Sequence, residues 1–355
     1  MTAAARRPGL DVLRVLAVAA VAWFHFGFRM QVTGEAGPLM AGDPGGLARY
    51  GYLGVSVFFA ISGYVISIST EGRDAYGFAV ARIARLWPTY VVCMSLTAAV
   101  MLAVPELGLP VGLTQYLANL TMLAPFLGQP FMDGAYWSIV AEIIFYSWVG
   151  LLMVARVWRN WQVWVAAVWL VIAALDLAVV ESDLLRRLLL TEFAGFFAFG
   201  MMLRALERGE TAAGVVLVAA FVQALAGAAA GAAKLPEAYA GAVFSIPVVL
   251  ACVSAGLLVL ALLVRLPAGA VPLGPVSLAG RATYPFYLLH QHIGYAVYFL
   301  LVPAIGLAGT TLALIGGLTA VALLISGVLE TPAARAIRAL GAGVRAFALA
   351  RIRAA

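Results

Sequence analysis

Ionisable side chains stand inside two apolar stretches that otherwise read as ordinary membrane helices. His25 follows Arg14 in the first stretch, and Glu142 lies in the apolar run 137–146. A charge inside hydrocarbon is costly, so such residues usually face the interior of a helix bundle and mark functional sites. Arg14 and His25 recur at helical spacing on one face, roughly 16 Å apart along the axis. If Arg14 lies at the cytoplasmic edge of a core about 30 Å thick, His25 lies near or beyond its midplane.

Each of these groups has a chemical and a structural interpretation. His25 could act as a general base near neutral pH, or it could be a core histidine bonded to a neighbouring helix. Glu142 could orient or charge-stabilise the histidine, or it could pair with an arginine across the bundle. Arg82 and Arg85 are three residues apart and share a face if helical, which suits a phosphate-rich ligand. The alternative is that this pair only anchors the cytoplasmic end of a span.

The other two histidines are His290 and His292. They are two residues apart, so a helix points them in different directions and they make a poor pair of metal ligands. No zinc-protease or carboxylate-rich spacing supports a metal elsewhere, so the sequence predicts no metal site.

The composition identifies the elements that must position these residues. The chain of 355 residues is 64% hydrophobic and 11% charged, with a mean hydropathy of +1.02. A soluble domain has roughly 25% charged residues, so we expect an all-α, polytopic transmembrane helix bundle. The basic residues behind the net charge of +6 are scattered between apolar runs, which argues against nucleic-acid binding.

The apolar runs predict about ten spans of roughly 20 residues: 12–30, 50–70, 86–104, 137–155, 161–180, 187–206, 212–233, 242–264, 282–302 and 308–329.

Basic residues orient this bundle. With the N-terminus inside, only five of the 22 arginines and lysines fall in outside segments, and the other 17 fall inside. This bias predicts that both termini are cytoplasmic and that the number of spans is even. The long segment 105–136 is then external and could include a short re-entrant helix. We expect a transmembrane domain over 1–332 and a short basic cytoplasmic tail over 333–355.

Several motifs, in this order, resemble the acyltransferase 3 family of integral membrane O-acyltransferases. The first is the segment from residues 10–14 to His25, the second is the run 54–64, and the third is Arg82–Arg85 with Pro88 and Tyr90. The fourth extends from Trp137-Ser138 through Glu142 to Phe145-Tyr146. The last two are Tyr284 with Tyr287, Leu288 and His290, and Glu330 with Pro332. Three positions depart from the pattern: Ser56 and Ile143 replace frequent acids, and His292 replaces a frequent proline. The chain ends too early for the hydrolase-like domain that many members carry, so it resembles the stand-alone branch.

The resemblance implies transfer of an acyl group, commonly acetyl, from cytoplasmic acyl-CoA to a hydroxyl of a surface or exported glycan or lipid-linked sugar. No tightly bound cofactor is implied beyond acyl-CoA as co-substrate, and the expected location is the inner cell membrane. On this basis the expected catalytic residues are His25 and Glu142. The expected substrate contacts are Arg14, Arg82, Arg85, Trp137, Tyr287 and His290. A transporter or flippase for a glycan intermediate or small solute remains an alternative, as does an O-acyltransferase for small lipophilic products.

Overall fold

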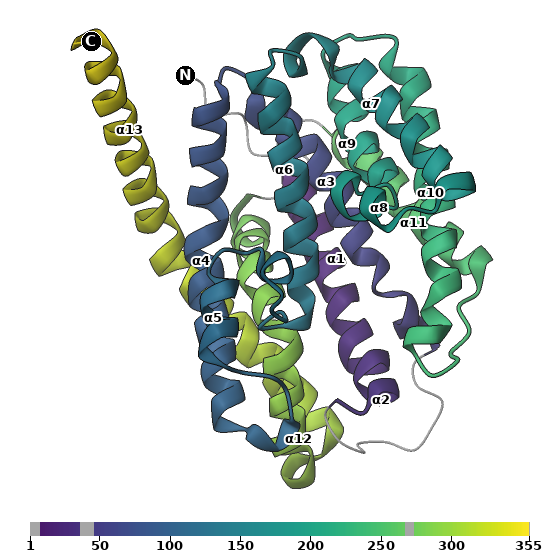
Figure 1. Cartoon of the computed structure of the whole chain (residues 1–355). Helices are drawn as coiled ribbons and strands as arrows, with labels where there is room; N and C mark the ends of the chain where they lie inside the picture. The colour runs from purple at the N-terminus through teal and green to yellow at the C-terminus, as the bar shows by residue number, and fades with distance from the viewer. Residues whose placement is uncertain (1–7, 36–45, 267–272, 355) are drawn as a thin grey trace.

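The chain forms a bundle of helices that run up and down past one another, as the computed structural model in Figure 1 shows. The structure describes residues 8–35, 46–266 and 273–354, and these contain no strand. This confirms the all-α membrane bundle. The α-helices are α1 Pro8–Phe24, α2 Met30–Thr33, α3 Leu53–Thr70, α4 Ala75–Ala103, α5 Leu113–Asn119, α6 Trp137–Val154, α7 Trp158–Leu175, α8 Asp183–Leu189, α9 Ala194–Glu207, α10 Ala213–Ala238, α11 Ile246–Leu263, α12 Leu273–Ile325 and α13 Thr331–Ala354.

Nine helical segments among the described residues are long and apolar enough to cross a membrane. The last of them, Val276–Arg351, is 76 residues long and contains both the ninth and the tenth predicted spans. Helical geometry breaks inside it at Gly306, where φ is 70° and ψ is 172°. That φ is open to glycine because it has no Cβ. The ribbon reverses near the lower end of α12 in Figure 1, so this single segment can cross twice.

Two helices differ in extent from the predicted spans. Helix α4 begins at Ala75 rather than at 86, because the Asp74 carboxylate accepts a hydrogen bond of 2.8 Å from Gly77 N and caps the helix start. Arg82 and Arg85 therefore lie on a helix and not in a loop. The predicted span 187–206 is interrupted: α8 ends at Leu189, and α9 begins four residues after Leu190.

Close helix packing fixes the centre of the bundle. A Cβ at Gly63 of α3 would overlap the Phe197 carbonyl of α9, and a Cβ at Gly200 of α9 would overlap the Ala60 carbonyl of α3. Small residues let membrane helices approach until their backbones touch, which replaces the hydrophobic drive that lipid cannot supply. Helix α1 passes into one π-helical turn at His25–Arg29. Such turns are rare and frequently occur at functional sites.

The basic tail is helical and is attached to the bundle. Helix α13 packs along the first part of α4, where Tyr76 Oη donates a 2.8 Å hydrogen bond to Gly341 O and Arg345 pairs with Asp74 at 2.8 Å. The start of α1 and the end of α13 lie at the same end of the bundle in Figure 1.

This arrangement leads to a topological prediction. We expect a reporter fused after Ala355 to behave as cytoplasmic and one inserted into 105–136 to behave as external, because basic residues concentrate on the inner side. Paired alkaline phosphatase and fluorescent-protein fusions measure both positions. An externally active C-terminal fusion would overturn the predicted orientation.

Candidate functional site

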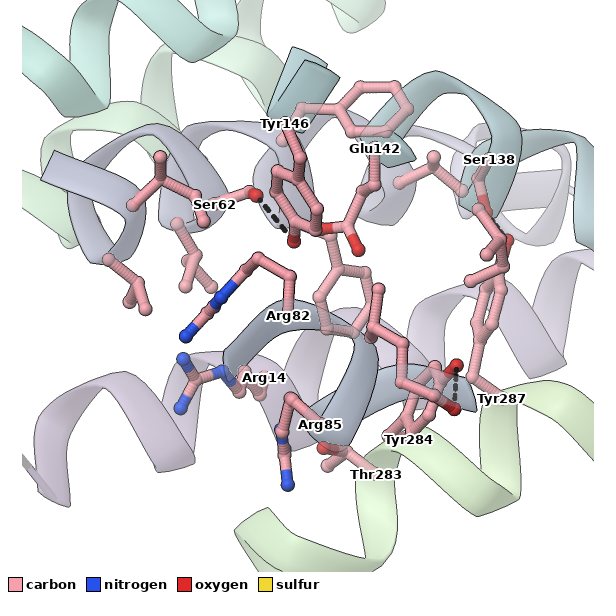
Figure 2. A pocket seen from close by; sticks show the side chains of 18 residues that line it. Arg14, Ser62, Arg82, Arg85, Ser138, Glu142, Tyr146, Thr283, Tyr284 and Tyr287 are labelled. Atoms are coloured by element: carbon pink, nitrogen blue, oxygen red, sulfur yellow. Dashed lines mark hydrogen bonds between the residues drawn. The ribbon is translucent and has the colours of Figure 1, made fainter. Parts of the chain in front are cut away.

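Three arginines converge on one cavity near the end of the bundle where α1 begins. This arginine cavity has a volume of about 140 Å³ and receives side chains from α1, α3, α4, α6 and α12. Figure 2 shows the guanidinium groups of Arg14, Arg82 and Arg85 gathered on one side, with Glu142 on the other. Its lining residues are Arg14, Val55, Phe58, Phe59, Ile61, Ser62, Val65, Ile66, Arg82, Arg85, Leu86, Ser138, Ile139, Glu142, Tyr146, Thr283, Tyr284 and Tyr287.

Two of the three guanidinium groups have protein carboxylates as partners. Arg14 pairs with Asp11 at 2.9 Å, and Arg85 pairs with Glu330 at 3.2 Å. Arg82 has no ion pair or hydrogen bond to the described part of the chain, and its buried Nε lacks a partner. Its guanidinium instead lies 5.9 Å from the ring centre of Phe78 and 6.0 Å from that of Tyr146.

This leaves Arg82 available to an anion. An arginine presents N–H groups in a planar fork that matches phosphate or carboxylate oxygens. Arg82 is half-buried, its Nε is buried without a partner, and the Glu142 carboxylate acts on it only at longer range, so a negatively charged ligand in contact with the guanidinium would stabilise this region.

A second cavity lies further along α1 and contains His25. This histidine cavity has a volume of about 260 Å³. Its polar side chains come from the π-helical extension of α1, the start of α3, the α8–α9 connection, the C-cap of α10, and α12. Trp137 adds an aromatic wall and is 39% exposed. The polar lining residues are His25, Arg29, Tyr52, Ser56, Glu192, Tyr239, Tyr287 and Gln291.

His25 contacts His290 across the bundle, and the contact assigns the proton on each ring. His290 Nδ1 lies 2.6 Å from Tyr287 O, and His25 Nδ1 lies 2.9 Å from Val21 O. A carbonyl oxygen only accepts, so both Nδ1 atoms carry hydrogen in the neutral rings. The remaining lone pair of His290, on Nε2, is 3.1 Å from His25 Nδ1 and can share that proton. His25 Nε2 therefore keeps its lone pair.

A thin wall separates the two cavities. Val55 and Tyr287 line both of them. Tyr287 is held in place because its Oη lies 2.7 Å from Ser138 Oγ and donates a 3.1 Å hydrogen bond to Ala135 O. The arginines and the histidine are thus placed in separate compartments that meet at one tyrosine and one valine.

The structure divides the predicted site residues between these places. Arg14, Arg82, Arg85 and Glu142 line the arginine cavity, whereas His25 and Trp137 line the histidine cavity. Tyr287 belongs to both, and His290 lies behind His25 with 0% exposure.

Glu142 shares no cavity with His25. Its carboxylate is therefore placed to influence the charge of the arginines and not to orient the histidine.

His292 has a separate role in the fold. Its Nδ1 donates to Met132 O at 3.1 Å, and its Nε2 accepts from Gly134 N at 3.3 Å. The buried Asp133 carboxylate also accepts a 2.9 Å hydrogen bond from His292 N. These contacts attach the segment before α6 to α12. The described residues contain no group of three or more histidine, cysteine or acidic side chains that could hold a metal.

Sequence reasoning missed several polar residues of the histidine cavity, chiefly Glu192, Tyr52 and Gln291. Glu192 carried the same signal as Glu142, since it is an ionisable residue inside the predicted span 187–206. Tyr52 and Gln291 carried no comparable signal, because uncharged polar residues are common in membrane helices.

Comparison with known proteins agrees with the motifs. A family described as an acyltransferase domain matches residues 7–330. "Protein 2 in picA locus" from Rhizobium radiobacter is 43% identical over 65 residues, which is 17% of this chain and 34% of that protein. The match thus spans about a third of that relative, and no solved structure matches the chain. Because the family match extends over nearly the whole helix bundle, the chain belongs to the acyltransferase 3 family and is a multi-pass membrane protein.

Proposed function

We propose that this enzyme transfers an acyl group, foremost acetyl, from cytoplasmic acyl-CoA to a hydroxyl of a cell-surface or exported glycan at the inner cell membrane. The observation that carries the proposal is the pair of cavities stacked along α1 and separated by Val55 and Tyr287. One cavity offers cations for the CoA phosphates, and the other offers a base beside a polar space for an acceptor.

The donor would enter from the side of the arginines. Arg82 and Arg85 hold phosphate oxygens, while Arg14 and Glu142 set the charge around the slimmer pantetheine arm. The thioester then reaches the wall at Tyr287. Tyr287 Oη contacts Ser138 Oγ, so this pair holds in place the wall across which the acyl carbonyl must meet the acceptor at His25.

The reaction at the wall is a balanced acyl transfer. His25 Nε2 takes the proton of the acceptor hydroxyl, the oxygen attacks the thioester carbonyl, and the C–S bond breaks. The thiolate of CoA gains a proton, so the products are the ester and free CoA. The same lone pair of His25 could instead carry the acyl group transiently, which separates the reaction into two transfers.

The direct test uses purified protein in detergent with [1-¹⁴C]acetyl-CoA. We expect saturable binding with millimolar affinity or better, together with release of CoA as a free thiol. A folded preparation that neither binds acetyl-CoA nor releases CoA would refute acetyl-CoA as donor. Butyryl-CoA and palmitoyl-CoA, assayed in parallel, report the preferred chain length.

His290 is expected to act by holding His25. Replacing His290 by leucine removes the acceptor beside His25 Nδ1, and a lost hydrogen bond of about 1 kcal/mol lowers kcat roughly fivefold to tenfold. His290→Gln retains an acceptor oxygen and should recover part of that loss. The KM for acyl-CoA should stay unchanged in both, because His290 lines neither cavity. Equal kcat in His290→Leu and the wild type would contradict this role.

A further inference from the structure

Glu192 is the residue on which this inference rests, and it lies at a break in the helical backbone. The last carbonyls of α8 would lack partners inside a membrane, but two indoles satisfy them. Trp148 Nε1 donates to Leu188 O at 2.7 Å, and Trp169 Nε1 donates to Leu189 O at 2.6 Å. Irregular backbone at membrane depth is tolerated where it is buried in protein or lines a cavity.

The residues around the break are anchored to α7 and its π-helical extension. Leu190 adopts a positive φ of 50°, and Thr191 Oγ1 donates a hydrogen bond to the buried Asp176 carboxylate. The same carboxylate accepts a 2.8 Å hydrogen bond from Ser182 N at the start of α8. With Thr191 held on that side, the next side chain, Glu192, lines the histidine cavity.

Helix α10 leaves space for Glu192. A Cβ at Gly227 would overlap Glu192 O, and a Cβ at Gly231 would lie 2.5 Å from Glu192 Oε1. The glycines therefore admit a carboxylate at a place where any larger residue would displace it. Among the described residues that line the histidine cavity, Glu192 is the one carboxylate.

Two buried donors of this cavity, Tyr52 Oη and Gln291 Nε2, have no hydrogen-bond partner among the described residues. The half-buried Glu192 carboxylate accepts no hydrogen bond and forms no close ion pair among the described residues, and only the longer-range charges of Lys234 and Arg186 act on it. Gln291 is 1% exposed. Buried polar groups are almost always hydrogen-bonded, so an unpaired acceptor and two unpaired donors around one space indicate a ligand with several hydroxyls.

We propose that Glu192 binds the acceptor by accepting a hydrogen bond from a hydroxyl next to the one that is acylated. This inference rests on the proposed acyl transfer to a glycan. Trp137 provides a flat apolar wall for a sugar ring, and its own ring packs 5.6 Å from that of Phe193. Glu192 thus selects polyhydroxylated acceptors, while His25 performs the proton transfer.

The test uses full-length enzyme in proteoliposomes with acetyl-CoA and two acceptor probes, methyl β-D-glucopyranoside and 1-octanol. Glu192→Gln should raise the KM for the glucoside about tenfold, and Glu192→Ala should raise it further, because a charge-assisted hydrogen bond is lost. Acetyl-CoA binding and kcat/KM for octanol should stay within twofold of the wild type. Glu106→Gln is the matched control, since it neutralises an exposed carboxylate elsewhere.

A second pair of variants approaches the carboxylate from α10. Gly231→Ala adds a methyl group against Glu192 Oε1 and should also raise the KM for the glucoside, whereas Gly214→Ala faces open space and should be silent. Any of three results would overturn the proposal for Glu192. The Glu192→Gln variant could keep the wild-type KM for the glucoside, the wild-type enzyme could acetylate octanol but not the glucoside, or the wild-type enzyme could acetylate neither probe. Wild-type enzyme that releases no CoA under any condition would instead refute the proposed donor.

Discussion

Replacing His25 by alanine is expected to reduce acyl transfer by about 10²–10⁴-fold, because this is the usual contribution of a general base. His25→Gln should be equally inactive, since glutamine retains hydrogen bonding but cannot take the acceptor proton. Both variants should bind acyl-CoA nearly as the wild type does, because His25 lines the histidine cavity and the arginines line the other. Initial rates of acetyl transfer and equilibrium binding of acetyl-CoA measure the two quantities separately.

The same variants distinguish the two roles of the imidazole. If His25 carries the acyl group, wild-type enzyme incubated with [1-¹⁴C]acetyl-CoA and no acceptor, then denatured rapidly at neutral pH, retains label that His25→Gln lacks. If His25 is a general base, neither protein retains label. An active His25→Ala enzyme would contradict both roles and would require another base.

Removing both Arg82 and Arg85 should produce the second large effect. Loss of one charge-assisted contact costs about 1.5–3 kcal/mol, so each alanine should weaken acyl-CoA binding tenfold or more. Arg82→Ala should be the more damaging, because Arg85 already pairs with Glu330 and Arg82 has no such partner among the described residues. Lysine should rescue only in part, since it lacks the planar fork.

Isothermal titration with acetyl-CoA and with desulfo-CoA measures this loss. Arg159→Ala serves as the control, because it removes an exposed arginine at the start of α7. Unchanged donor affinity in a folded double variant would assign Arg82 and Arg85 to membrane orientation alone.

Periodicity and hydropathy predicted the bundle because a membrane requires long apolar helices whose backbone groups are satisfied within each segment. The same signals placed the start of α4 too late. The turn that carries Arg82 and Arg85 is polar, yet it continues the helix from its cap at Asp74. An apolar run indicates only the part of a helix that contacts lipid. Helix α4 begins before its apolar run, so hydropathy alone did not predict its first turns.

Contacts between distant helices could not be predicted in this way. His25 and His290 are 265 residues apart, and their contact depends on how α1 and α12 are rotated and tilted against each other. The spacing of Arg14 and His25 predicted a shared helix face but gave no sign of the wall between their cavities. The break before Glu192 was also hidden, because the indoles that satisfy it come from α6 and α7.

The wall formed by Val55 and Tyr287 also has an electrical consequence. Where water enters a membrane protein from both sides, the transmembrane potential falls mainly across the thin layer that remains dry. Each elementary charge that crosses such a layer exchanges about 2.3 kcal/mol per 100 mV with the field. The proton that leaves the acceptor at His25 and reaches the CoA thiolate beyond Tyr287 would cross that layer in one direction, and the acyl group would cross it in the other. The two movements carry equal formal charge in opposite directions, so complete turnover would move no net charge through the membrane field. Acyl transfer would then proceed equally well in energised and de-energised membranes, and the same two side chains would keep the cell from leaking protons.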